Sequence, residues 1–190
     1  MDYSVSHPAR LPRLDDLPFV PLGGQPGFAP GAIEAFVAAP RVALLAYLRS
    51  DGRPGQAPIW YTHRLGAFHM STVTGSPKHR ALERDPRVCL TIQDERPPYR
   101  ALIADGEVEL AKLEAGAEDP TAGMAVRNFG RLGAGEYERM TESEYARSGL
   151  TLITLRPSGL RGFDNTRALG RAALLFMRLR DRLPVPRPWL

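Results

Sequence analysis

Between residues 41 and 110, short apolar segments alternate with turn signals, and this pattern constrains the fold more than any other feature of the chain. The apolar segments span 41–49, 54–61, 67–72, 87–93 and 99–110. Their length and composition are typical of strands, and Ser50-Asp51-Gly52 is typical of a hairpin turn. Pro58 indicates an edge strand or a bulge, because proline cannot donate to a ladder. Asp105-Gly106 predicts a kink. Short strands joined by turns favour an antiparallel barrel over a doubly wound sheet.

Outside this stretch the pattern is less regular. Further strands are predicted at 150–156 and 160–163, and helices at 31–39, 76–84, 120–131, 142–148 and 168–183. Residues 1–30 are rich in proline and glycine and predict an arm that lies on the body. We therefore expect one domain over 31–165, preceded by this arm and followed by a C-terminal helix and tail over 166–190.

Bulk composition describes a soluble globular protein. Of 190 residues, 43% are hydrophobic and 24% are charged. No apolar run is long enough to span a membrane, and no signal peptide is evident, so a cytoplasmic protein without stable membrane insertion is expected. The net charge of +4 suits an anionic ligand, but no nucleic-acid-binding motif is present. Lys78 and Lys112 are the only lysines among the 25 basic residues.

The segment from Ser71 to Arg80 is the strongest candidate for a binding site. A strand that ends in hydroxyls leads through a turn into a helix with Ser76 as N-cap and Pro77 at the first helical position. Free amides at a helix N-terminus attract anions, and Lys78 in the first turn has the wrong sign for the helix dipole unless an anion binds. Local physics alone leaves open that Lys78 is a solvated surface residue. The spacing excludes a P-loop.

Other single residues indicate little chemistry. The histidines and the single cysteine have no metal-ligand spacing, so no metal site is expected. No serine has convincing partners for a nucleophilic triad. Cys89 lies in an apolar strand and is interpreted as a core residue. Trp60 is either a core aromatic or the wall of a pocket for a planar ligand.

An ordered series of short motifs resembles a known family. The matching pieces are Arg41-Val42-Ala43-Leu44-Leu45-Ala46, Asp51-Gly52-Arg53-Pro54, Ala57-Pro58-Ile59-Trp60-Tyr61, Ser76-Pro77-Lys78 with Leu82, Arg84-Asp85-Pro86-Arg87-Val88, Pro98-Tyr99-Arg100 and Gly106. Together they are similar to the FMN-binding split-barrel superfamily that includes pyridoxamine 5'-phosphate oxidase. The likeness is greater to its branch of flavin/deazaflavin-dependent oxidoreductases, many of which use coenzyme F420.

The resemblance implies an antiparallel split β-barrel, mainly β with a few helices, that forms a homodimer with cofactor sites at the subunit interface. It implies ten cofactor-binding residues: Arg53, Gln56, Ala57, Pro58, Ile59, Trp60, Ser71, Thr72, Ser76 and Lys78. The second strand would lie beside the ring, and the third strand and following helix would hold the phosphate. Arg53 would meet an acidic group.

The implied activity is hydride transfer between reduced F420 and a small organic substrate. Tyr61, His63 and Tyr99 are candidates to protonate the product, but no catalytic residue is assigned. One alternative is FMN as cofactor, with oxidase or reductase chemistry. Another is a non-catalytic carrier of a cofactor or haem on the same fold. F420 is favoured because its polyglutamate tail would suit an arginine-rich surface.

Overall fold

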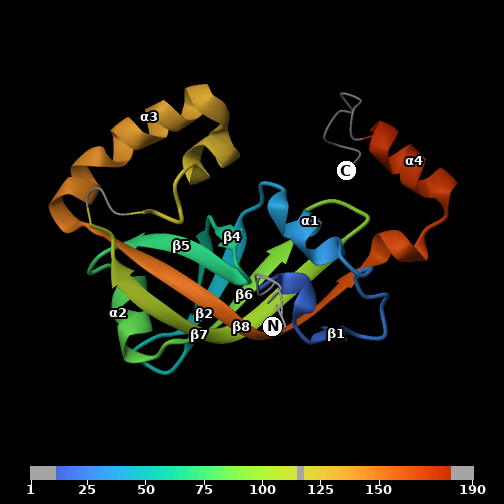
Figure 1. Cartoon of the computed structure of the whole chain (residues 1–190), viewed down its shortest axis with the longest axis horizontal. Coiled ribbons are helices and arrows are strands. Elements are labelled where there is room, and N and C mark those ends of the chain that lie inside the picture. The colour runs from blue at the N-terminus through green and yellow to red at the C-terminus, as the bar shows by residue number, and fades with distance from the viewer. Residues whose placement is uncertain (1–11, 115–117, 181–190) are drawn as a thin grey trace, which may run out of the picture.

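A single mainly antiparallel sheet with few helices forms the body of the protein in the computed structural model, which describes residues 12–114 and 118–180. Its strands are β1 (Phe19–Pro21), β2 (Ala43–Leu48), β3 (Pro54–Ile59), β4 (Thr62–Arg64), β5 (Ala67–Val73), β6 (Arg87–Gln93), β7 (Arg100–Lys112) and β8 (Leu150–Asp164). Seven of them follow the order β3-β2-β6-β7-β8-β5-β4, and β1 pairs in parallel with β8 (Figure 1). The prediction of a mainly antiparallel β protein is confirmed.

The long strand β8 pairs with three other strands, β1, β5 and β7. Its first residues, Leu150 to Leu155, pair with β5, and Leu160 to Gly162 pair with β1. The sequence predicted two separate strands here. They form one strand because β7 pairs with β8 from Thr151 to Asp164. The register shifts between Asp105 and Gly106, which confirms the kink predicted at that position.

Strand β3 lies at one end of the sheet order and pairs with β2. Pro54 and Pro58 both lie in it, opposite Leu48 and Leu44 of β2. Proline is tolerated at an edge because its missing N–H can face away from the neighbouring strand. The prediction of an edge strand from Pro58 is therefore confirmed.

Residues from the body and the N-terminal segment share one hydrophobic core. Leu14, from the short 3-10 helix η1 (Leu14–Asp16), is completely buried. Phe28 packs with Phe36 of helix α1 (Ala32–Ala38), their ring centroids 5.0 Å apart. The described part of the predicted arm thus packs on the body. Residues 1–11 of the arm lie outside the described residues.

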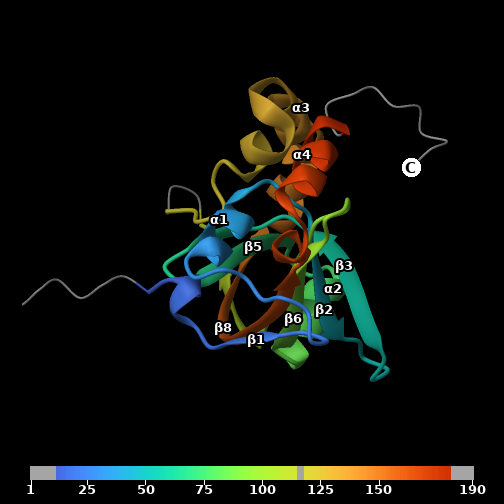
Figure 2. The same ribbon diagram turned by 90° about the vertical axis from the view of Figure 1, so that its right-hand side faces the viewer.

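Two helices, α3 (Met124–Ser148) and α4 (Arg171–Arg180), lie on the same side of the sheet, α3 near the start of β8 and α4 beyond its far end (Figures 1 and 2). The two helices predicted at 120–131 and 142–148 are one element, interrupted at Gly130, whose φ of 72° and ψ of 172° are not helical. The predicted last helix is divided into η2 (Asn165–Ala168) and α4, and residues 181–183 of that prediction lie outside the described part. No helix in the described ranges is long and apolar enough to cross a membrane.

Candidate functional site

Strands from opposite ends of the sheet order line one cavity of about 430 Å³. We call it the Lys78 cavity. Its lining residues come from the position before β2, from the end of β3 and the residue after it, from β5, from helix α2 (Pro77–Arg84), from α3 and from the start of β8. They are Val42, Pro58, Ile59, Trp60, Ser71, Thr72, Val73, Lys78, Met124, Tyr137, Tyr145 and Leu150. The volume is within the range of about 300–1,000 Å³ typical of small-molecule sites.

One side of the Lys78 cavity carries hydroxyls and a helix start. Ser71 and Thr72 lie near the end of β5, and the Thr72 Oγ1 is 3.2 Å from the Ser76 Oγ. The Ser76 Oγ also accepts a hydrogen bond of 3.2 Å from the backbone N–H of His79, and Pro77 is the first residue of α2. The predicted N-cap and helix start are therefore confirmed.

Lys78 is a half-buried cation without a counter-charge. No carboxylate in the described part of the chain forms an ion pair with its Nζ, and burial lowers the pKa of its ammonium group below 10.5. Desolvating a cation without pairing it is unfavourable. An anion bound in the cavity would remove that penalty and accept hydrogen bonds from Nζ.

The other side of the cavity is aromatic. The Trp60 ring contacts Phe129 at 5.0 Å and Tyr137 at 4.9 Å between centroids. The hydroxyls of Tyr137 and Tyr145 form a hydrogen bond of 3.0 Å. Trp60 therefore packs against other aromatic rings and also forms a wall of the cavity. Its contact with Tyr137, in the second half of α3, holds the ring in place.

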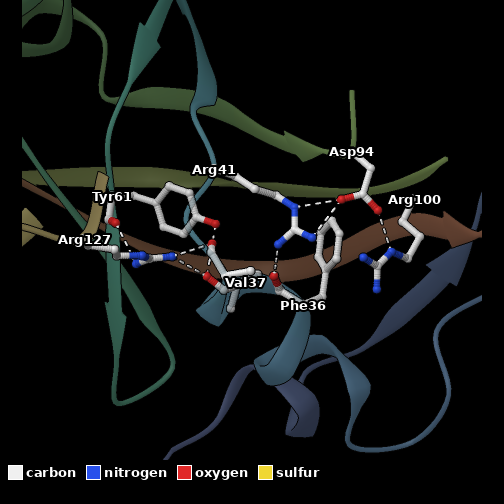
Figure 3. Close-up of polar contacts among 8 residues, drawn as sticks. Phe36, Val37, Arg41, Tyr61, Asp94, Arg100 and Arg127 are labelled. Carbon is white, nitrogen blue, oxygen red and sulfur yellow. Dashed lines mark hydrogen bonds and ion pairs between the residues drawn. The ribbon is translucent and has the colours of Figure 1, made fainter. Parts of the chain in front are cut away.

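Partly buried contacts of Arg127 attach the first part of α3 to the body (Figure 3). Its Nη1 donates to the Tyr61 carbonyl at 3.0 Å, and its Nη2 donates to the carbonyls of Val37 and Ala39 at 2.7 and 2.8 Å. The guanidinium also lies 5.0 Å from the centre of the Tyr61 ring. These contacts fix the helix just before the break at Gly130.

Comparison with known proteins identifies the family. The model of the pyridoxamine 5'-phosphate oxidase family matches residues 29–162. The chain belongs to this family. The match extends past the stretch of 41–110 that carries the resemblance in sequence, and it includes the whole of α3. The family takes its name from an oxidoreductase.

Solved structures similar to this family member include a conserved hypothetical protein from Mycobacterium tuberculosis, with a TM-score of 0.59, 21% identity, and coverage of 78% of this chain and 92% of that one. An F420 reductase is similar with a TM-score of 0.49 and 22% identity over 70% of this chain and 98% of that one. An FAD-binding protein from Mesorhizobium loti has a TM-score of 0.47 and 16% identity over 71% and 94%. The first likeness supports the shared fold. No curated protein sequence matches the chain significantly.

The structure brings together most of the ten residues predicted to bind a cofactor. Six line the Lys78 cavity: Pro58, Ile59, Trp60, Ser71, Thr72 and Lys78. Ser76 reaches it through its contact with Thr72. The remaining three, Arg53, Gln56 and Ala57, lie in or beside the earlier part of β3 and do not line the cavity. Binding by these ten residues stays a prediction.

None of the three candidate proton donors lines this cavity. Tyr61 is 1% exposed and donates its hydroxyl hydrogen to the Val37 carbonyl at 3.1 Å; burial raises its pKa. The His63 Nε2 lies 3.4 Å from the Glu34 Oε2, and burial lowers the pKa of the imidazole although Glu34 opposes this. Tyr99 is exposed and lies just before β7.

Sequence reasoning missed the contribution of α3 to the site. Met124, Tyr137 and Tyr145 line the cavity but were not candidates. Gly130 lies near the end of the first predicted helix, and Gly133 and Gly135 lie between the two predicted helices. These glycines obscured the long helical segment that follows the break at Gly130. A signal was present, because the tyrosines are eight residues apart and so lie close to the same helix face.

Proposed function

We propose that this protein is an oxidoreductase that transfers a hydride between reduced coenzyme F420 and a small organic substrate, as a homodimer with the cofactor at the subunit interface. The observation that carries the proposal is the unpaired, half-buried Lys78 beside the hydroxyls of Ser71 and Thr72, in one cavity with Trp60. Membership of a family named after an oxidase supports the reaction class.

The residues of the Lys78 cavity fit the phosphate and ring of such a cofactor. Lys78 supplies a charge-assisted hydrogen bond, which is stronger and shorter than a neutral one. The hydroxyls of Ser71 and Thr72 add two further donors to a phosphate oxygen. Trp60 and Ile59 offer apolar surface that a planar ring can cover, as in most small-molecule sites.

A bound deazaflavin or flavin supplies hydride transfer, and the protein supplies position, electrostatics and exclusion of water. Lys78 binds the anionic end, and the cluster of Trp60, Phe129 and Tyr137 keeps water from the apolar end. The hydroxyls of Tyr137 and Tyr145 hold protons at the cavity wall. They replace Tyr61, His63 and Tyr99 as the groups able to donate a hydrogen bond to a substrate there.

The choice of F420 over FMN rests on charge and on the sequence resemblance. Both cofactors contain a ring, a ribityl chain and a phosphate, so Lys78 serves either. We expect F420 to bind at least tenfold more tightly than FMN, a difference of about 1.4 kcal/mol. Titration of the cofactor-free protein with each compound, followed by tryptophan fluorescence, measures this ratio.

Three outcomes of that titration separate the alternatives. Protein purified with stoichiometric FMN and indifferent to F420 would replace F420 by FMN in the proposal. Tight binding without turnover of any hydride acceptor would favour a carrier. Failure of both compounds to bind would refute the proposed cofactor site.

The homodimer has its own test. We expect light scattering at micromolar concentration to report twice the chain mass of 20.9 kDa. An interface that completes a buried site is typically large, on the order of 2,000 Å². A mass of one chain would refute the assembly.

A further inference from the structure

A second and larger cavity, of about 1080 Å³, adjoins the Lys78 cavity. We call it the Arg100 cavity. Val42 and Pro58 line both cavities, so a ligand in one lies against the same two side chains as a ligand in the other. The chain thus has room for a second molecule next to the proposed cofactor.

Three of the charged side chains that line the Arg100 cavity form a fixed cluster (Figure 3). Asp94 accepts from Arg41 Nε and Nη2 through Oδ1, at 2.9 and 2.7 Å, and from Arg100 Nε through Oδ2, at 2.6 Å. Both guanidinium groups also face the ring of Phe36, at 4.2 and 4.9 Å from its centre. Ion pairs and ring contacts together hold both arginines in position before any ligand arrives.

Arg100 retains unused donors. Its Nε is the only nitrogen engaged with a partner among the described residues, so Nη1 and Nη2 remain available. The side chain is 30% exposed, against 14% for Arg41, whose Nη1 is already bonded to the Phe36 carbonyl. A guanidinium with two free nitrogens on one edge matches the two oxygens of a carboxylate.

The charge of the cluster selects a monoanion. Arg41 and Arg100 with Asp94 carry a net charge of +1, and the neighbouring Glu95 and Arg96 cancel each other. One carboxylate neutralises the cluster, whereas a phosphate dianion leaves an excess negative charge beside Asp94. Partly buried charges are unfavourable unless they are balanced in this way.

The remaining walls of the Arg100 cavity are largely apolar. Leu44 of β2 lies on the body side, and Leu174 and Met177 of α4 lie on the other. Leu174 and Met177 are three positions apart and therefore lie on one face of α4. A ligand that fills this space carries an apolar body as well as the carboxylate.

We propose that the Arg100 cavity binds the substrate and that the substrate is an amphipathic monocarboxylate, with its carboxylate on Arg100 and its apolar body between Val42 and α4. The assignment as a substrate rests on the proposed function; the carboxylate site itself does not. The same carboxylate chemistry occurs in the polyglutamate tail of F420, so the experiment must separate the two sources.

The test uses the full chain, octanoate as the probe and calorimetry as the measurement, with and without saturating FMN, which has no tail. We expect octanoate to bind in both conditions and the uncharged octan-1-ol to bind at least about tenfold more weakly, because it lacks a charge-assisted hydrogen bond. Arg100→Gln should weaken octanoate binding by at least about tenfold. The matched control Arg161→Gln should not, since Arg161 pairs with the Asp105 carboxylate away from both cavities.

A second variant guards against misfolding of Arg100→Gln. Met177→Trp fills the apolar wall without altering charge, and it should also weaken octanoate binding at an unchanged melting temperature. Equal binding of octanoate and octan-1-ol, or octanoate binding unaffected by both variants, would overturn the proposal. Competition of octanoate with F420 but not with FMN would also overturn it, by assigning the carboxylate site to the cofactor tail. If octanoate binds as expected and neither cofactor binds, the carboxylate site stands and the proposed function fails.

Discussion

The two cationic sites of this protein differ in how their positive charge is balanced. Lys78 is half-buried with no ion-pair partner among the residues that the structure describes, and burial lowers its pKa. Arg41 and Arg100 are held by Asp94, by a backbone carbonyl and by the Phe36 ring. An unpaired cation is unfavourable for the empty protein and favourable for anion binding, whereas in a paired cluster the loss of one partner leaves a buried charge uncompensated and destabilises the fold. Loss of Lys78 and loss of Asp94 should therefore affect different properties.

Removing Asp94 should have the largest effect, and on stability. Asp94→Ala leaves two arginines partly buried without their shared carboxylate, and we expect a loss of about 3 kcal/mol in the free energy of unfolding. Urea unfolding measures it. The control Asp105→Ala removes the exposed pair with Arg161 and should cost less than about 1 kcal/mol. Equal losses in the two variants would show that the cluster is no more stabilising than a surface ion pair.

Removing Lys78 should affect binding instead. We expect Lys78→Ala to weaken cofactor binding by about 1.5–3 kcal/mol, the scale of a charge-assisted hydrogen bond. The stability of the empty protein should be unchanged or higher by a few tenths of a kcal/mol, because the cation opposes the helix dipole. Fluorescence titration and urea unfolding give the two quantities.

The chain supplies its own control for this variant. Lys112 is the only other lysine, and its exposed side chain pairs with the Glu114 carboxylate at 3.4 Å. Lys112→Ala should change neither binding nor stability measurably. Equal cofactor affinity in the two variants at low salt, where charge contacts are least screened, would remove residues 71–80 from the binding site.

The smallest expected effect is a pH dependence of the empty protein. The pKa of Lys78 is lower in the folded than in the unfolded chain, so between that pKa and 10.5 the unfolded chain binds more protons. The stability of the wild type relative to Lys78→Met should therefore rise with pH through this window. Urea unfolding between pH 8 and 10.5 tests it. A relative stability that falls with rising pH would mean that an acidic partner stabilises the Lys78 cation in the folded state.

Local patterns in the sequence predicted the parts of the fold that depend on local physics. Strands β2, β3, β5, β6 and β7 followed from apolar runs and turns, and α2 followed from its cap at Ser76. Strands β1 and β4 were missed because three residues cannot show an alternating pattern. The continuity of β8 was missed because it depends on pairing with β7 and not on its own Pro157 and Gly159.

The candidate site divides in the same way. The residues near Lys78 were found because a strand end, a cap and a cation are adjacent in the sequence. Tyr137 and Tyr145 reach the cavity because Arg127 attaches α3 to carbonyls about 65–90 positions earlier in the chain. The Asp94 cluster likewise joins residues that are 53 and 6 positions apart. Contacts between residues of different elements leave no periodic pattern in the sequence.

The prolines of the edge strand β3 decide how a second copy of the chain can approach. Alternate residues of an edge strand direct their N–H groups outward, and Pro54, Gln56 and Pro58 share that direction. Of these three residues only Gln56 has a backbone N–H that can donate a hydrogen bond. The open edge of β3 is therefore a poor template for pairing with another strand. If the proposed homodimer forms, we therefore expect that it does not extend the sheet across the two chains at β3.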